Sequence, residues 1–302
     1  MWTGWITLSG LGEPMTISRA RVLALIVCSC VLSIASPGLT PPSDGNSADQ
    51  IASAYKSRLN HEVVTLRIPC TSDVQHFDED GNLRSKPHAG PWTLYGRLMV
   101  ESVKTNGRQL ELVGKRIWVR FIGDQMQNIV PNPAIPVEID IDLPQGPNAA
   151  TKTDAAMLKV LLGTGGKMSD IVPDYWKPYF AGVEGGAPPL TAREQFKAKL
   201  KASKTDPSKI SEGVSQGKLI HAVRPAYPRQ AQMIGMSGSV KLHAVIGKDG
   251  RIHSLYIEKP VGAGMDDEAV KAVQKWRYKP YYIKGIPRDV ETDITINFQN
   301  ER

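Results

Sequence analysis

Two acidic patterns are the first places where this chain could do chemistry, because carboxylate oxygens can hold a divalent metal ion. They are Asp140-x-Asp142 and the set Asp78, Asp80 and Asn82. The first pair falls on the polar positions of an alternating strand pattern, so we expect both carboxylates to face solvent. The second set departs from a calcium-binding loop because Gly81 comes too early in it. Both patterns therefore predict ordinary surface carboxylates and no metal centre.

A glycine-rich segment and the histidines offer two further kinds of site. Residues 163–168 read Gly-Thr-Gly-Gly-Lys-Met, but a phosphate loop needs glycine where this chain has Leu161 and a hydroxyl where it has Met168. Of the six histidines, only His243 and His253 have a spacing that brings two rings together across one hairpin. Two ligands alone make a weak metal site, and no serine or cysteine has the sequence context of a catalytic nucleophile. The sequence predicts a protein that is not an enzyme and carries no cofactor.

The N-terminus has the features of an export signal. Two arginines precede an apolar run over residues 22–35, which is as long as the core of a signal peptide and too short to span a bilayer. Ser33-Ile-Ala35 supplies the small residues of a cleavage site, so we expect the mature chain to begin near Ser36, in the periplasm or cell envelope. A lipoprotein attached at Cys30 and an uncleaved anchor are the alternatives. Cleavage would leave Cys70 as the sole cysteine, so no intramolecular disulfide is expected.

The composition indicates a soluble chain with room for two domains. It has 302 residues, of which 41% are hydrophobic and 22% charged, as is ordinary for globular proteins. The formal charge of +7 is spread along the chain, without the interleaved aromatic and arginine residues that are typical of nucleic-acid binders. We therefore expect no nucleic-acid partner. In the envelope such a chain could meet anionic lipid or cell-wall polymer, so membrane association stays open beside the alternative of a merely soluble surface.

The last part of the chain carries the most regular pattern, which indicates helix, hairpin, helix and strand. Pro228 suits the first turn of a helix, and Asp249-Gly250 suits the hairpin turn, with a bulge near His253-Ser254 in the returning strand. The apolar residues of the second helical face are Met265, Ala269, Ala272, Val273 and Trp276. Residues 290–298 alternate as a last strand. We predict an α+β domain over residues 217–302, with an antiparallel sheet whose apolar face two helices cover.

Four motifs in this region belong together at their spacings. They are Tyr227-Pro228-x-x-Ala231, Gly238-x-Val240, Asp249-Gly250 and Trp276-Arg277-Tyr278-x-Pro280. Residues 217–302 thereby resemble the C-terminal domain of the TonB family. In that family the periplasmic domain binds a short peptide of an outer-membrane transporter by adding it as a strand to a sheet edge, which is β-augmentation. Large aromatic residues at a helix end usually pack inward, so Trp276 and Tyr278 are expected in the core.

The resemblance implies that the partner pairs with an exposed strand. The last strand is added to a hairpin, and such a strand commonly lies at a sheet edge. We therefore predict that a partner peptide binds along Val290, Glu291, Thr292, Asp293, Ile294, Thr295 and Ile296. The alternating polar residues of this strand are expected to face outward, where they would discourage aggregation.

Residues 51–143 show a different, β-rich pattern. The candidate strands cover residues 63–68, 92–103, 109–113, 116–121 and 137–143. Roughly six short strands at this spacing predict a small open barrel or sandwich. The complete division is a signal peptide or anchor (1–35), a flexible lead (36–50), a β-rich domain with a helical C-terminal part (51–190), a polar linker (191–216) and the TonB-like domain (217–302).

Together these features predict an exported, non-enzymatic envelope protein with a peptide-binding C-terminal domain. Its expected partner is an outer-membrane transporter peptide or another envelope protein, in energy-dependent transport. The alternatives are a periplasmic ligand- or glycan-binding protein that uses this domain for protein interaction, and an envelope hydrolase with an unrecognised site. Coupling to a proton-driven motor and homodimerisation stay open.

Overall fold

The computed structural model describes residues 47–184, 201, 207–209 and 218–300. The expected signal segment and most of the expected linker lie outside these residues. The described residues all belong to one compact unit, and their elements are a mixture of α-helices and sheets that are largely antiparallel. Within the described part of the chain, no helix is long and apolar enough to cross a membrane.

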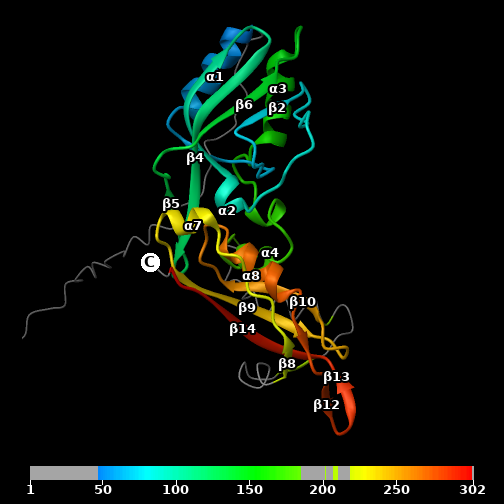
Figure 1. Ribbon diagram of the computed structural model, residues 1–302. Coiled ribbons are helices and arrows are strands. Elements are labelled where there is room, and N and C mark those ends of the chain that lie inside the picture. The colour runs from blue at the N-terminus through cyan, green and yellow to red at the C-terminus, as the bar shows by residue number, and fades with distance from the viewer. Residues whose placement is uncertain (1–46, 185–200, 202–206, 210–217, 301–302) are drawn as a thin grey trace, which may run out of the picture. The chain divides into compact units, whose positions relative to one another are not determined.

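The N-terminal region is built on one six-stranded sheet (Figure 1). Its strands, in spatial order, are β1 (Val63–Thr65), β3 (Arg97–Thr105), β4 (Gln109–Ile122), β6 (Pro136–Asp142) and β2 (Val74–Phe77), and β5 (Gln125–Ile129) pairs with the second half of β4. Only the β2–β6 pair is parallel. The helices α1 (Ala48–Leu59) and α3 (Ala149–Val160) share one apolar core with this sheet.

The expected small open barrel or sandwich is not what the described residues form. Two helices cover the apolar face of a single sheet, the place that a second sheet would take in a sandwich. An alternating pattern predicts that one face is buried, but it does not say which kind of element covers that face. Helix α1 begins at Ala48, inside the expected flexible lead, and a capping box of Ser47 and Gln50 marks its start. That capping box is visible in the sequence.

Two other local expectations for this region were wrong. Trp92–Tyr95 form a helical turn, α2, after Pro91 and do not open a strand. The two strands expected over 109–121 are one continuous strand, β4, which passes through Gly114. A side chain at Gly114 would lie 2.1 Å from the carbonyl oxygen of Met99, so this glycine marks a close approach of β3 and is not a turn. The short, polar strands β2 and β5 were missed.

The C-terminal region has the expected α+β composition. Its main sheet has the order β10 (Ile252–Lys259), β9 (Gly238–Ile246), β14 (Val290–Phe298) and β7 (Ser208–Lys209). Helices α7 (Arg229–Met233) and α8 (Met265–Val273) contribute to the core on the apolar face of this sheet. Gly250 takes a φ of 74° in the hairpin turn, and the register of the returning strand shifts between Ile252 and Ser254. The predicted hairpin and bulge are thus confirmed.

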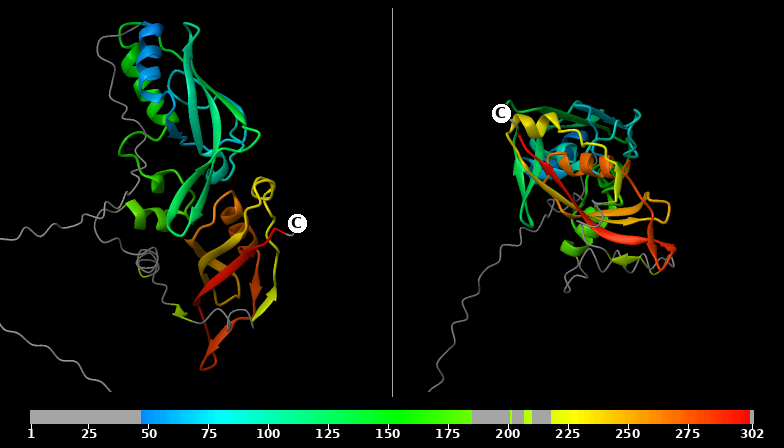
Figure 2. Two further views of the ribbon diagram at one scale, coloured as in Figure 1. Left: turned by 90° about the vertical axis from the view of Figure 1, so that its left-hand side faces the viewer. Right: turned by 60° about the horizontal axis from the view of Figure 1, so that its bottom comes forward.

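Two small ladders lie at one end of this region. They are β8 (Leu219–His221) with β11 (Arg277–Tyr278), and β12 (Tyr281–Ile283) with β13 (Ile286–Arg288). The second ladder is a hairpin that projects beyond the main sheet in Figure 1 and in the left view of Figure 2.

The two sheets share a continuous apolar core. Aromatic residues of the segment between them, on and before α4 (Lys177–Glu184), pack with α2 and β4: the Trp92 and Trp176 ring centroids are 5.3 Å apart. The same cluster includes Leu242 of β9 and Met265 of α8. Residues of the N-terminal region and of the C-terminal region therefore pack into one common core.

A loop joins the sheets through backbone hydrogen bonds. The Phe121 N–H donates to the Val261 carbonyl, and the Ala263 N–H donates to the Val119 carbonyl, both at 2.8 Å. Gly262, with a φ of 101°, lies against this strand, and a side chain there would meet the Val119 oxygen at 2.3 Å. The Asp266 carboxylate accepts the N–H groups of Val261 and Gly262 at 2.7 Å. Burial of this carboxyl raises the pKa of Asp266 to about 7.

Candidate functional site

The outer edge of β14 is the predicted partner-binding edge, and the chain itself uses it. Strand β7 pairs with β14 in parallel, with Ser208 opposite Val290 and Lys209 opposite Glu291. The Ser208 N–H donates to the Asp289 carbonyl at 3.0 Å. We expected β14 to be the outermost strand of the sheet, but β7 lies outside it. The sequence could not reveal this pairing because it joins segments that are far apart along the chain.

The directions of the backbone groups follow from this contact. The Asp289 carbonyl points to β7, and successive residues of a strand alternate the side to which their N–H and C=O groups point. The main-chain groups of Glu291, Asp293 and Thr295 therefore point to the outer edge. Those of the intervening residues bond to β9, with which β14 is in register from Val290 to Phe298. Of the seven predicted contact residues, these three would supply the main-chain bonds to an added strand.

The side chains of β14 are divided between an apolar and a polar face. Val290, Ile294 and Ile296 are buried in the core, as alternation predicts. The polar side chains were expected to face solvent, but Glu291 is only 5% exposed and Asp293 is half-buried. The alternation assigns a residue to a face and cannot show what that face meets in the folded protein.

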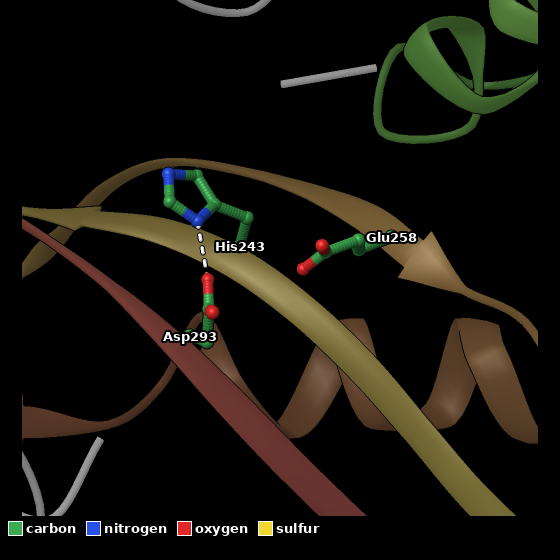
Figure 3. Close-up of side chains that lie close together, drawn as sticks. All are labelled: His243, Glu258 and Asp293. Carbon is green, nitrogen blue, oxygen red and sulfur yellow. Dashed lines mark hydrogen bonds and ion pairs between the residues drawn. The ribbon is translucent and has the colours of Figure 1, made fainter. Parts of the chain in front are cut away.

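A polar cluster on this face joins β14 to its neighbours (Figure 3). The His243 ring on β9 is fully buried, and its Nδ1 lies 2.6 Å from Asp293 Oδ1. Its Nε2 lies 3.3 Å from Glu291 Oε2. Glu258, on β10, approaches from the other side of β9, so three strands contribute to one cluster.

This cluster has the residue types of a metal site, but a lysine takes the place of the ion. One ligand atom from each of His243, Glu258 and Asp293 lies within 4.8 Å of the others. The Lys241 ammonium lies 3.2 Å from a carboxylate oxygen of Glu258 and of Asp293. Although partial burial opposes its charge, hydrogen bonds to these two carboxylates raise the pKa of Lys241. The cluster is best explained as an ion-pair network, in which a metal ion would have to displace an ammonium group.

His243 and His253, which could have met across the hairpin, do not lie opposite each other. Strand register places Tyr256, not His253, opposite His243. The His253 Nε2 instead lies 2.9 Å from Asp249 Oδ1, beside the hairpin turn. His253 is the extra residue of the bulge in β10, so it has no register partner on β9.

The two acidic patterns are explained without a metal. Asp78 Oδ1 accepts the N–H groups of Asp80 and Asn82 at 3.0 and 2.8 Å, which stabilises a turn, and the hydrogen bonds from Asn82 lower the pKa of Asp78. Asp140 was expected to face solvent but is 5% exposed and lies 2.8 Å from His76 Nδ1. Burial raises the pKa of Asp140. The missed strand β2, which carries His76, is what covers this carboxylate.

The motif residues near the start of the domain hold its framework. The Tyr227 hydroxyl donates to the Met236 carbonyl, and its ring packs edge-on against Phe298 with centroids 5.6 Å apart. Pro228 is the residue that caps α7, one position earlier than we expected. A side chain at Gly238 would lie 2.8 Å from Val261. These contacts are structural, and none of them points to a reacting group.

The later motif residues join the end of α8 to the hairpin turn. The Tyr278 N–H donates to the Gly250 carbonyl at 2.8 Å. A side chain at Gly250 would lie 2.0 Å from the carbonyl oxygen of Tyr278. Tyr278 is buried as predicted, whereas Trp276 is only partly buried. Its Nε1 donates to the Val223 carbonyl at 2.8 Å, so Trp276 fixes the segment after β8. Pro280 follows β11 and precedes the projecting hairpin.

Comparison with known proteins assigns this region to a family. The profile of the Gram-negative bacterial TonB protein C-terminal family matches residues 223–299. The chain is similar to protein TonB of Pseudomonas aeruginosa, with 42% identity over 57 residues, covering 18% of this chain and 17% of that protein. It is similar to protein TonB of Klebsiella pneumoniae, with 34% identity over 94 residues, covering 31% of this chain and 36% of that protein. Residues 223–299 are therefore a TonB C-terminal domain.

A solved structure also matches the same part of the chain. The solution NMR structure of the Pseudomonas aeruginosa TonB C-terminal domain shares 31% identity and covers 28% of this chain and 87% of that one, with a TM-score of 0.26. The chain spans about a sixth of the one curated TonB protein and about a third of the other.

Proposed function

We propose that this is an exported, non-enzymatic envelope protein whose TonB C-terminal domain binds a short peptide by strand addition to β14. The partner is a segment of an outer-membrane transporter or of another envelope protein, in energy-dependent transport. One observation carries the proposal: residues 208 and 209, which lie outside the matched range 223–299, already add to this edge as a strand. An edge that accepts one extended segment has the main-chain geometry to accept another.

The pairing of β7 also suggests how a partner would bind. Because β7 runs parallel to β14, we expect a partner peptide to lie parallel as well. It would replace the chain's own contacts along this edge, at Glu291, Asp293 and Thr295, whose main-chain groups point to the same side. The partner therefore competes with an intramolecular strand, and its apparent affinity is reduced by the fraction of molecules in which that strand is paired.

Thr295 is the position at which to test this edge. Proline there removes an outward N–H and leaves the bonds of β14 to β9 in place. Asp293 is a poorer choice, because its side chain also holds His243 and Lys241. We expect Thr295→Pro to weaken binding by about tenfold or more, since two or more hydrogen bonds along the edge depend on the register of the added strand.

The measurement is fluorescence anisotropy of the full chain with labelled synthetic peptides from the periplasmic N-terminal segments of outer-membrane transporters. Thr295→Val is the matched control, because it keeps the N–H and the side-chain shape. Circular dichroism and thermal melting establish that both variants are folded. A folded Thr295→Pro variant that binds as tightly as Thr295→Val would show that the peptide does not bind at this edge.

A further inference from the structure

The β12–β13 hairpin exposes three large apolar side chains. All seven residues from Tyr282 to Arg288 are exposed. Tyr282 is 62% exposed, Ile283 42% and Ile286 55%. The hairpin stands clear of the main sheet (Figure 2). Single exposed apolar residues are ordinary, but three large ones on one projecting turn indicate an interaction surface.

The charges on this hairpin are all of one sign. Residues 279–288 contain Lys279, Lys284 and Arg288 and no acidic residue. None of these three side chains forms an ion pair with any residue that the structure describes. At the base of the hairpin, the Lys218 Nζ lies 5.2 Å from the centre of the Tyr281 ring and adds a fourth cation. The hairpin therefore combines exposed apolar groups with uncompensated positive charge.

The hairpin is held in a defined conformation. Tyr281 is buried in a small core with Ile246, Tyr278 and Val290, which anchors the base. At the tip, Lys284 and Gly285 both take positive φ values, 52° and 76°, as in a tight two-residue turn. Asparagine or glycine is favoured at the first of these positions. The lysine is thus not explained by the requirements of the turn.

We propose that the tip of this hairpin docks on the surface of a bilayer that contains anionic phospholipid. Tyr282 and the Ile283–Ile286 pair would enter the headgroup region, and Lys284 and Arg288 would lie against the phosphates. Tyrosine is enriched at the membrane–water interface, and lysine and arginine are attracted to anionic headgroups.

A bilayer fits this surface better than a protein groove does. Pairing of Tyr282 with Pro287 and of Ile283 with Ile286 places exposed apolar residues on both faces of the ribbon, because neighbouring residues of a strand point to opposite sides. A groove on a protein would cover one face, whereas a fluid headgroup layer takes up both.

The test is co-sedimentation of the full chain with phosphatidylcholine vesicles, with and without about a third of phosphatidylglycerol. We expect binding to the anionic vesicles, weakening as salt is raised because the Debye length shortens. The double variant Tyr282→Ser/Ile286→Ser should lose this binding by about tenfold or more. The matched control is Ile122→Ser/Val130→Ser, which removes two comparably exposed apolar side chains elsewhere and should bind as the parent does.

The variant Lys284→Asn is a second, independent test of the proposal. If Lys284 served only the turn, asparagine would leave vesicle binding unchanged, and the melting temperature would stay equal or rise. The proposal expects the same or higher melting temperature together with weaker binding to anionic vesicles.

The proposal is overturned if the full chain does not bind anionic vesicles, or if binding is equal for both lipid mixtures. It is also overturned if the two double variants bind alike. Loss of transporter-peptide binding by the hairpin variant, with vesicle binding intact, would assign the hairpin to the peptide site instead. Peptide affinity is measured on the same samples, so failure of the strand-addition proposal is seen separately.

Discussion

The two sheets of this protein end differently. The N-terminal sheet ends in β1 and β2, strands of three and four residues. The C-terminal sheet has a nine-residue strand, β14, whose outer side meets β7, which is described over two residues. Short edge strands are a common protection against unwanted pairing, and a long strand near an edge is a template for it. The difference supports the proposal of strand addition to the C-terminal sheet.

The two sheets are alike in what lies between them. The cluster around Trp92, Trp176 and Leu242 belongs to both, and the loop at Gly262 bonds to the end of β4. A TonB C-terminal domain here does not stand alone on a spacer but shares its core with the preceding sheet. The two sheets therefore share a core but differ at their edges, and separate substitutions can test each of these properties.

The largest expected effect is on the shared core. Trp176 is fully buried, and Trp176→Ala should reduce the free energy of unfolding by about 3–5 kcal/mol because it leaves a large cavity. Unfolding in denaturant, followed by far-ultraviolet circular dichroism, should show one transition at a lower midpoint. Leu112→Ala, in the core of the N-terminal sheet alone, should lower the same transition. A second transition that stays at the parent midpoint would show that the sheets unfold independently.

The next effect depends on pH and tests the loop that joins the sheets. Burial raises the pKa of Asp266 from 3.8 to about 7, so the protonated form is favoured in the folded state. Its contribution to stability is complete below pH 3.8 and is lost as the pH rises to about 7. The loss is at most about 4 kcal/mol, since each pKa unit corresponds to about 1.4 kcal/mol.

The measurement is the free energy of unfolding at several pH values between about 4 and 8, for the parent and for Asp266→Asn. The variant keeps one acceptor oxygen for the loop and cannot ionise. We expect a flatter dependence on pH in the variant. Parallel curves for the two proteins would show that Asp266 does not titrate in this range.

The smallest effect concerns the edge. Ser208→Pro removes the N–H that donates to Asp289 and should weaken the pairing of β7 with β14. A partner peptide that competes with β7 should then bind about three- to tenfold more tightly, the worth of about one hydrogen bond. The measurement is the same anisotropy titration, with Ser208→Ala as the control that keeps the N–H. Equal or weaker binding by Ser208→Pro would mean that β7 does not compete with the partner.

The sequence alone determined the local framework of the C-terminal domain. The turn at Asp249-Gly250, the bulge beside Ser254 and the helix that begins at Met265 follow from backbone preferences and apolar periodicity, which are properties of neighbouring residues. That helix ends at Val273, so Trp276, which was expected on its apolar face, lies beyond it. The four spaced motifs, including Tyr227-Pro228, were sufficient to identify the family. In the N-terminal region the same reasoning found most of the strands but joined them into the wrong architecture.

Only the tertiary structure decided what each face and edge meets. It brought β7 to β14, covered Asp140 with β2, and placed Lys241 between Glu258 and Asp293. It also left the apolar tip of the β12–β13 hairpin exposed. These are contacts between segments that are far apart in the chain, and their free energy depends on packing and on the exclusion of water by elements that no local pattern specifies. The sequence therefore identified the TonB C-terminal domain, and the fold decided which segments its faces and edges meet.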